Sequence, residues 1–251
     1  MAMTGGAIVT GGAGDLGFAI AERLAADGWR IGLLDRDMQA AESGAARIKG
    51  AMPLAADVTD EAACQAAVAA FGAVDLLVNN AGIGRFGKLH ELSTADFRLV
   101  LEVNLAAPYI MAKAAVLGMI ARGRGIIINI TSINALVPGP GAGAYPAAKA
   151  GLARLTEQMA LEWGPLGIRV NSIAPGFIDG GISKPFYAEP AVRARRGAAV
   201  PLKRLGLAAD VAEAAVFLAS EKASYISGHQ LVVDGGVTPS VLLQLPREAK
   251  A

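Results

Sequence analysis

The sequence is poor in cysteine, in aromatic residues and in charge. Its 251 residues include one cysteine, Cys64, with 5% aromatic residues, 18% charged residues and a net charge of +1. A single cysteine forms no internal disulfide and has no cysteine partner for a zinc site, so we expect Cys64 to be a packed thiol in an alanine-rich helix. A net charge near zero gives no field that attracts nucleic acid or a membrane surface, and we expect neither as a partner.

Long hydrophobic runs and linkers are also missing. No stretch approaches the ~18 uninterrupted apolar residues of a membrane-spanning helix. The opening residues 1–6 carry neither the basic region nor the apolar region of a secretory signal. We therefore expect a cytoplasmic protein. No repeated, low-complexity or linker-like segment divides the chain, which predicts one domain over residues 1–251.

The sequence does contain short apolar runs that alternate with longer stretches rich in alanine and leucine. We expect helices from about residue 16 and over 38–49, 106–121 and 148–163, and strands at 7–9, 30–35, 54–57, 74–79, 126–130, 169–173 and 230–234. The central runs are apolar without alternation, as in strands that are covered on both faces. This order predicts an α/β fold: a single doubly wound Rossmann domain with a central, mostly parallel seven-stranded sheet flanked by helices. Its ligand should lie beyond the carboxyl ends of the strands.

The least regular part of the sequence is the segment 177–205. It contains Gly180, Gly181, Pro185, Pro190 and Pro201. Because so long an insertion between a strand and a helix usually covers a site, we expect a substrate lid at about 177–205. A C-terminal tail follows at 237–251.

A glycine-rich turn at residues 10–17 joins the first strand to the first helix. Glycines there let the backbone approach a pyrophosphate closely, and the start of the helix offers free N–H groups. The alternative is a tight turn without a ligand. The second strand ends at Asp35, 18 residues beyond Gly17, where an acidic side chain can bind the ribose hydroxyls of an adenosine. A carboxylate also repels the 2′-phosphate of NADP, which favours NAD, although the neighbouring Arg36 could pair with that phosphate.

Three polar residues with catalytic chemistry follow the fifth predicted strand. Tyr145 and Lys149 are four apart and so share one face of a helix, and Ser132 lies just past the end of the strand. A glycine- and proline-rich loop at 138–143 connects them, which allows all three to meet at the carboxyl edge of the sheet. Taken singly, each has an ordinary structural role as a packing tyrosine, a solvated lysine or a turn-capping serine.

In its order of motifs the chain resembles the short-chain dehydrogenase/reductase family, in its classical branch, from Thr10 to Gly236. The motifs that carry the resemblance are the glycine turn at 10–17, Asp57-Val58, Asn79-Asn80-Ala81-Gly82, Asn104, Ser132, Tyr145 with Lys149, Arg169-Val170-Asn171, and Pro175-Gly176. Together, at matching spacings, these motifs are far more specific than any one of them.

The resemblance implies a catalytic role for four residues. Tyr145 would be the general acid or base, and Lys149 would favour the phenolate and hold the nicotinamide ribose. Ser132 would orient the reacting oxygen, and Asn104 would hold a water that links Lys149 to solvent. No metal is required in this chemistry.

The resemblance also implies a set of contacts with the cofactor. These fall on Gly11, Gly14, Asp15, Leu16, Gly17, Asp35, Asp57, Val58, Asn80, Ala81, Gly82, Tyr145, Lys149, Pro175, Gly176 and Ile178.

The chain departs from the family pattern at two positions. Asp15 stands where the family usually has glycine, and because a carboxylate is repelled by a pyrophosphate we expect its side chain to turn away and cap the helix. Gly180 stands where the family often has a threonine that bonds the carboxamide, and Ser183 is the substitute we consider.

These observations predict an NAD(H)-dependent oxidoreductase that interconverts a ketone and a secondary alcohol, such as a polyol, a sugar or a related hydroxy compound. One alternative is an NADPH-dependent reductase of 3-oxoacyl thioesters, and another is a catalytically silent, cofactor-binding regulator or scaffold. Arg193, Arg195 and Arg196 of the predicted lid could attract an anionic substrate, although a solvated helix face is the commoner reason for such a cluster. Asn134 also stands close to the site in sequence.

The assembly is predicted from two helical stretches, at 106–121 and 148–163. They are apolar on more than one side, and relatives in the family commonly pack the corresponding helices against a twofold-related copy. We therefore expect a homotetramer with dihedral symmetry. Ordinary packing onto the sheet would need only one apolar face.

Overall fold

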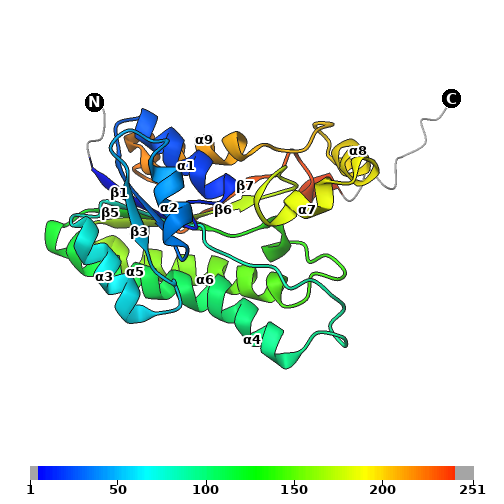
Figure 1. Cartoon of the computed structure of the whole chain (residues 1–251), viewed down its shortest axis with the longest axis horizontal. Helices are drawn as coiled ribbons and strands as arrows, with labels where there is room; N and C mark the ends of the chain where they lie inside the picture. The colour runs from blue at the N-terminus through cyan, green and yellow to red at the C-terminus, as the bar shows by residue number, and fades with distance from the viewer. Residues whose placement is uncertain (1–4, 241–251) are drawn as a thin grey trace.

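The computed structural model describes residues 5–240 and contains one parallel sheet of seven strands (Figure 1). The strands are hydrogen-bonded in the order β3-β2-β1-β4-β5-β6-β7, and every pair is parallel. Their bounds are β1 Gly6–Thr10, β2 Arg30–Asp35, β3 Met52–Ala55, β4 Leu76–Asn79, β5 Gly125–Ile130, β6 Ile168–Pro175 and β7 Gln230–Val233. The order reverses between β1 and β4, so the topological switch point lies beside the end of β1.

Helices cover both faces of the sheet (Figure 1). The upper face in this view carries α1 Asp15–Ala26, α2 Met38–Ala45 and α9 Ala208–Ala219. The lower face carries α3 Glu61–Phe71, α5 Ala107–Arg122 and α6 Tyr145–Trp163. Helix α4, Thr94–Leu101, runs into α5 through one π-helical turn, η1 Glu102–Ala106. The predicted doubly wound α/β fold is therefore confirmed, and the sheet is parallel throughout.

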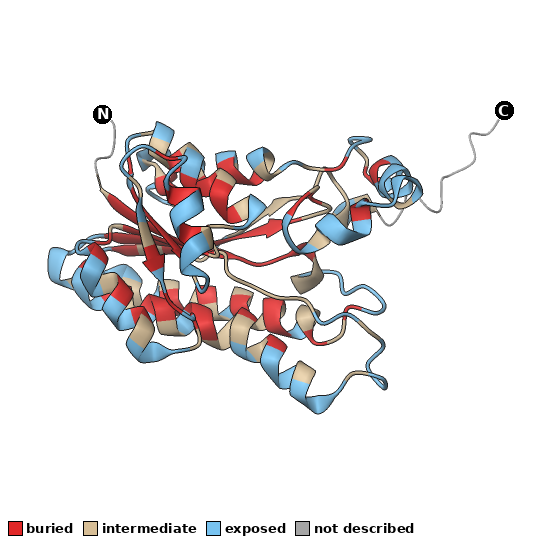
Figure 2. Cartoon of the chain, viewed as in Figure 1, coloured by how far each residue is buried: buried red, intermediate tan, exposed pale blue. Residues whose placement is uncertain are grey.

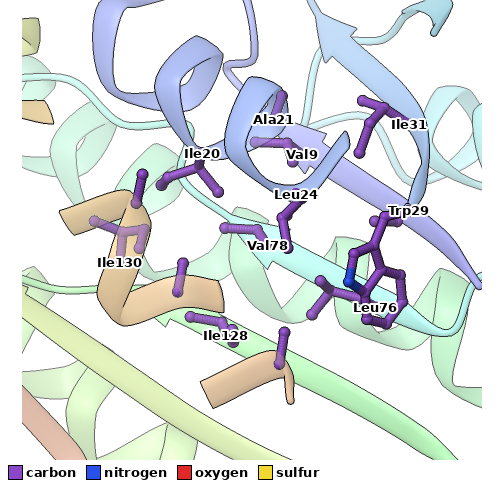
Figure 3. Close-up of a cluster of buried hydrophobic side chains, with 14 of the residues drawn as sticks. Val9, Ile20, Ala21, Leu24, Trp29, Ile31, Leu76, Val78, Ile128 and Ile130 are labelled. Atoms are coloured by element: carbon purple, nitrogen blue, oxygen red, sulfur yellow. The ribbon is translucent and has the colours of Figure 1, made fainter. Parts of the chain in front are cut away.

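The sheet contributes side chains to two separate hydrophobic cores, because successive residues of a strand point to opposite faces. Val9 and Leu76 belong to the core under α1 and α9, which Figure 3 shows in close-up. Their strand neighbours Ile8 and Leu77 belong to the core over α3 and α5. All four side chains are fully buried. Burial on both faces explains why these strands are apolar without alternation, and Figure 2 shows the sheet as the most deeply buried layer.

Several element boundaries differ from the sequence expectation. The helix expected over 38–49 ends as α2 at Ala45, and the strand expected over 54–57 is β3 at Met52–Ala55. Helix α6 begins at Tyr145, three residues before the expected start at 148. Pro146 occupies its first turn, where a proline loses no hydrogen bond because the first N–H groups of a helix have no intrahelical acceptor.

The segment 177–205 is more regular than its sequence suggests. It forms a 3₁₀ turn, η4 Gly181–Ser183, followed by the helices α7 Lys184–Tyr187 and α8 Pro190–Ala199. Pro185 and Pro190 stand in the first turns of α7 and α8, where they start helices instead of breaking them. Both helices project from the end of the sheet where β6 finishes (Figure 1). Of the expected C-terminal tail, residues 241–251 lie outside the described part.

One stretch among the described residues, Thr94–Arg122, is long and apolar enough to cross a membrane by length and composition. It comprises α4, η1 and α5, and 44% of its most apolar window is buried inside the protein. Met111 and Met119 of α5 are fully buried against the sheet, whereas Tyr109 and Leu117 are exposed. Packing onto the sheet therefore accounts for one side of this helix and leaves apolar side chains on another.

Candidate active site

A cleft of about 1180 Å³ opens at the carboxyl ends of the strands. It is lined by the turn after β1, by the residues that follow β2, β3, β4, β5 and β6, and by η4, α7 and α8. Every cofactor or catalytic residue that we named from the sequence lines this cleft, except Asn104. The topology thus gathers residues that are spread from Gly11 to Ile178 into one site.

The glycine turn supplies the first wall of the cleft. Gly11 has a φ of +60°, in the left-handed region that favours glycine. A side chain on Gly17 would lie 2.3 Å from the carbonyl oxygen of Gly11, so the turn and α1 pack too closely for any other residue there. Helix α1 begins at Asp15 without a side-chain cap. Its first N–H groups therefore remain free to bind an anion in the cleft.

Asn80 fixes this turn to the sheet. Its side-chain amide donates hydrogen bonds to the carbonyl oxygens of Thr10 and Gly11, at 3.0 and 3.2 Å. The Thr10 hydroxyl in turn accepts from the N–H groups of Asn80 and Ala81, both at 3.0 Å. Two neighbouring strand ends, β1 and β4, are thereby locked together at the switch point of the sheet.

Two carboxylates follow the next strands along the edge of the sheet. Asp35 ends β2, and its Oδ2 accepts from the N–H of Ala13 in the glycine turn at 3.3 Å. Asp57 accepts from the backbone N–H and the hydroxyl of Thr59, at 2.9 and 2.7 Å, which lowers the pKa of its carboxyl below the ordinary value. Both side chains line the cleft and offer acceptors for ribose hydroxyls or for the amino group of a base.

Asp15 does not cap α1, so that expectation was wrong. It occupies the first position of the helix, after Gly14 at the cap position, and no side chain caps this helix end. The carboxylate turns instead toward the inserted segment. It lies 3.1 Å from the ammonium of Lys184 and accepts from the N–H of Gly181 at 3.4 Å. The lysine compensates a negative charge that would otherwise stand unpaired beside an anion-binding turn.

Tyr145, Lys149 and Ser132 meet where β5 ends and α6 begins. The ammonium nitrogen of Lys149 donates to the carbonyl oxygen of Ile130 at 2.8 Å and lies 5.6 Å from the centre of the Tyr145 ring. Lys149 is 3% exposed, an exceptional burial for a lysine. The Ser132 Oγ accepts from the N–H of Asn134 at 3.1 Å, which leaves its proton free to donate.

Burial dominates the protonation of this group. Desolvation raises the pKa of Tyr145 to about 12, and the Ser132 hydroxyl partly opposes that rise. Desolvation also lowers the pKa of Lys149 to about 7. The family resemblance implied that Lys149 and the positive nicotinamide ring together acidify the phenol. Among the protein's own groups, the loss of water outweighs this effect, and Tyr145 is held in its protonated form.

Asn104 lies in the π-helical turn η1 and is fully buried. Its amide donates to the carbonyl oxygens of Ile83 and Val100, at 2.9 and 3.0 Å, and accepts from the N–H of Ile83 at 3.3 Å. A side chain on Gly82 would come within 2.7 Å of Asn104 Oδ1 and 3.6 Å of Lys149 Nζ. Asn104 therefore supports the loop after β4 from behind, next to Lys149, instead of facing the cleft.

Sequence reasoning missed an aromatic wall beside Tyr145. The ring of Phe86 lies 6.2 Å from that of Tyr145 and 5.3 Å from that of Phe186, measured between ring centres. Phe86 follows β4 and Phe186 belongs to α7, so the contact closes the cleft from both sides. Val237 and Thr238 also line it. None of these residues belongs to a periodic pattern or motif, and their proximity is visible only once the fold is known.

The lining residues fit a dinucleotide. The volume of the cleft exceeds the ~300–1,000 Å³ typical of a pocket for one small ligand. It is lined in the order of the strands by Asp57 and Asp35 after β3 and β2, by the free helix end after β1, and by Tyr145 and Lys149 beside β5. Two acceptors for an adenosine, an anion-binding turn and a lysine–tyrosine pair therefore stand in the order in which the parts of a nicotinamide dinucleotide are joined.

Comparisons with known proteins agree with this geometry. The sequence model of the family described as Enoyl-(Acyl carrier protein) reductase matches residues 11–238. Inactive 2-(S)-hydroxypropyl-CoM dehydrogenase 2 of Xanthobacter autotrophicus is 42% identical over 84% of this chain and 96% of that protein. 2-(S)-hydroxypropyl-CoM dehydrogenase 3 of the same organism is 37% identical over 92% of this chain and 95% of that protein.

A solved structure of similar fold is that of a gluconate 5-dehydrogenase from Burkholderia cenocepacia in complex with NADP and tartrate. It superposes with a TM-score of 0.91 at 33% identity and covers 96% of this chain and 97% of that one. The likeness extends over both the sheet and the segment that covers its carboxyl end.

Proposed function

Since this chain belongs to the short-chain dehydrogenase/reductase family and is an NAD(P)-dependent oxidoreductase of secondary alcohols and ketones, we propose that Tyr145, Lys149 and Ser132 carry its reaction. The observation that supports this most directly is the junction of β5 and α6. There a half-buried phenol, a buried ammonium 5.6 Å from its ring and a serine hydroxyl line one cleft with the glycine turn.

Each of the three residues has a separate task, and that of Lys149 is to hold the nicotinamide ribose. The Ser132 hydroxyl donates to the oxygen of the substrate and orients it. Tyr145 gives that oxygen a proton when a ketone is reduced and takes one when an alcohol is oxidised. When bound, the nicotinamide ring accepts or supplies the hydride and, in its oxidised form, brings a positive charge to the site. Asn104 holds the loop after β4 against Lys149, and we assign to it the supply of protons through a bound water.

Without a bound cofactor, the protonation state of Tyr145 favours reduction of a ketone over oxidation of an alcohol. Because burial keeps the pKa of Tyr145 near 12, the phenol is ready to donate a proton to a ketone. Oxidation of an alcohol needs a cation beside the phenol to favour its phenolate form. Lys149, with its pKa lowered to about 7, is only partly charged at neutral pH. We therefore propose that acidification of Tyr145 depends on the oxidised cofactor more than on Lys149.

We propose NAD as the preferred cofactor. Asp35 supports this choice, because its carboxylate lines the cleft at the end of β2, against the N–H of Ala13. A 2′-phosphate near that carboxylate would be repelled by ~4 kcal/mol at a separation of ~4 Å and an effective dielectric of ~20. Arg36 also lines the cleft and opposes this effect. The similar gluconate 5-dehydrogenase was solved in complex with NADP. The choice between NAD and NADP therefore depends on individual residues, such as Asp35 and Arg36, within one fold.

We further propose one domain over residues 1–251, in which the segment 177–205 acts as the substrate lid, and a homotetramer as the assembly. Exposed apolar side chains on α5 and α6 support a subunit interface: Leu117 and Leu161 are 72% and 74% exposed. Large apolar patches on a surface usually mark contacts with another chain. Light scattering of the purified protein, which gives the mass in solution, tests this; a monomeric mass would exclude it.

The variant Tyr145→Phe tests the proposed function. It removes one hydroxyl, so turnover of the best alcohol in a broad panel should fall ~10³-fold or more, while the affinity for NADH, measured by fluorescence titration, should change by less than about threefold. Tyr187→Phe is the matched control, because Tyr187 is a second tyrosine on the same cleft and is buried. It should lower turnover by a few-fold at most. Turnover that survives in Tyr145→Phe, or a wild type that oxidises no alcohol, would overturn the proposal.

A further inference from the structure

The charges along the cleft are divided unevenly between its two ends. Its three lining carboxylates, Asp15, Asp35 and Asp57, all stand on the glycine turn or at the ends of β2 and β3. The other lining cations stand on the elements that form the opposite end of the cleft: Lys149 on α6, Arg196 on α8, and the arginine at 85 after β4. No aspartate or glutamate among residues 5–240 lines that second end. The part of the cleft that would hold the substrate is therefore positive.

Of these cations, Arg196 is the one that has neither an ion pair nor a side-chain hydrogen bond among the described residues. Arg85 pairs with Asp96 at 3.3 Å, and Lys149 is occupied by the carbonyl oxygen of Ile130. Within the described part of the chain, Arg196 forms no ion pair. Its guanidinium instead lies 4.7 Å from the centre of the Phe177 ring. Phe177 is the residue that directly follows the Pro175-Gly176 pair.

A comparison along α8 separates Arg196 from its neighbours. Arg193 makes a two-pronged contact with Asp179, which anchors α8 to the segment after β6. Arg195 is exposed and does not line the cleft. Arg196 alone among the three lines it. The three arginines, which look alike in the sequence, thus have different places: Arg193 anchors α8, Arg195 lies outside the cleft, and Arg196 lines it.

Stacking on Phe177 preserves the ability of Arg196 to bind an anion. A guanidinium that lies over a ring is attracted by the face of the ring and is held in place, while its N–H groups at the edge stay free to donate. Arginine binds carboxylates, and tetrahedral oxyanions such as phosphate, through two parallel hydrogen bonds. Phe86 and Phe186, which line the same cleft, add an apolar surface beside Tyr145.

From this arrangement we propose that Arg196 selects substrates that carry an anionic group, a carboxylate or a sulfonate, besides the alcohol that reacts. The substrate class is then a hydroxy acid and its keto acid product, with a short apolar skeleton that lies along Phe86 and Phe186. This inference rests on the proposed function, because it names the substrate of the same site. It adds a residue and a chemical class that the glycine turn and the tyrosine–lysine pair do not specify.

The test compares acids with their neutral esters. The probes are 3-hydroxybutanoate and 4-hydroxypentanoate, each beside its methyl ester, with NAD as the second substrate. The wild type should have the higher kcat/KM for the acids. In Arg196→Gln that value should fall ~10- to 100-fold, as expected for the loss of hydrogen bonds to a charged group, while the value for the esters should change little. Arg196→Lys should restore part of the loss, because one ammonium replaces a two-pronged contact.

Arg195→Gln is the matched control, since it removes a neighbouring positive charge outside the cleft. It should leave the ratio of acid to ester unchanged. The preference for acids should also weaken at high salt in the wild type, because screening reduces attraction at an exposed site. A loss of equal size in Arg196→Gln and Arg195→Gln would indicate a general surface field and would overturn the assignment to Arg196.

A binding measurement separates this inference from the proposed function. Calorimetric titration of the protein–NADH complex with butanoate, propanesulfonate and butanamide reports on Arg196 without any turnover. Both anions should bind the wild type ~10-fold or more tightly than the amide, and Arg196→Gln should abolish the difference. Equal binding of anion and amide by the wild type would overturn the inference and leave the dehydrogenase assignment intact. An Arg196→Gln variant that weakens NADH binding instead would assign the arginine to the cofactor and would also overturn it.

Discussion

The two ends of the cleft are built in different ways. The cofactor end consists of strand ends and turns that hydrogen bonds between backbone and buried side chains hold together, as in the contacts of Asn80 with Thr10 and Gly11. The substrate end is formed largely by the segment 177–205, whose ion pairs are exposed: Lys184 pairs with Asp15 of the body, and Arg193 pairs with Asp179 within the segment. Surface ion pairs contribute little to stability, about 0–1 kcal/mol each.

This difference teaches how one fold combines a fixed chemistry with a variable substrate. A turn that is locked to the sheet keeps the cofactor in one place, because its geometry depends on the same contacts that fold the domain. Ile178 anchors the segment in the core under α1 and α9, but the exposed residues of the segment can change, and with them its contacts with the substrate, at little cost to the fold. Predictions that act on the two ends should therefore differ in size.

The largest effect is expected where the two ends meet, at Lys149. Replacement by methionine removes the amine that we propose holds the nicotinamide ribose beside Tyr145, and it should lower kcat ~10³-fold through loss of both positioning and acid–base support. Steady-state kinetics at saturating NAD measure this. Lys113→Met is the control, because Lys113 is exposed and bound to Glu61 on the outer surface. A decrease of similar size in both variants would contradict a catalytic role.

The buried Lys149 should also make the stability of the wild type depend on pH, and Lys149→Met should remove this dependence. The pKa of Lys149 is about 7 in the folded protein and 10.5 in its ordinary environment. Between these values the unfolded chain binds a proton that the folded chain does not, so the free energy of unfolding of the wild type rises with pH over this window. Methionine does not titrate, so it contributes no such pH dependence to the free energy of unfolding. The Tm of Lys149→Met should exceed that of the wild type most at pH 7, and the difference should shrink toward pH 9.5. A difference that is constant over this range would contradict the lowered pKa.

The sequence predicted the cofactor end well for a physical reason. Strands buried on both faces must be apolar at every position, as in Ile8, Val9, Leu76 and Leu77, so they stand out without an alternating pattern. The turn that follows β1 needs glycine where backbone segments approach within van der Waals distance, as Gly17 does with Gly11. Constraints of this kind act on neighbours in sequence and are therefore visible in it.

The substrate end was predicted less well because its constraints connect distant positions. Asp15 and Lys184 are 169 residues apart, and no local pattern reveals that the carboxylate would pair with the lid instead of capping α1. The prolines of α7 and α8 suggested irregular structure, although proline in a first turn is compatible with a helix. Phe86 and Phe186 meet only because the segments after β4 and β6 cover the same cleft.

A smaller effect is expected at Asp35, on the cofactor end. Asp35→Asn removes the charge and keeps an oxygen that can accept from the N–H of Ala13. If about half of the ~4 kcal/mol repulsion of a 2′-phosphate applies here, the ratio of kcat/KM for NAD to that for NADP should fall ~30-fold. Kinetics with both cofactors give the ratio. Asp37→Asn, one turn away at the cap of α2, is the control. A wild type that already prefers NADP would show that Arg36 outweighs Asp35.

The smallest effect is expected at the Asp15–Lys184 pair, which connects the two ends. Lys184→Gln leaves the Asp15 carboxylate uncompensated at the anion-binding turn, where a like charge at ~4 Å costs ~1 kcal/mol in water; NAD should therefore bind ~5-fold more weakly. Asp15→Asn should bind NAD as tightly as the wild type or more tightly, and the double variant should recover most of the loss. Fluorescence titration of all four proteins completes the cycle. Additive effects in the double variant would mean that the pair does not act as a unit, and that the lid is held to the cofactor end by its other contacts.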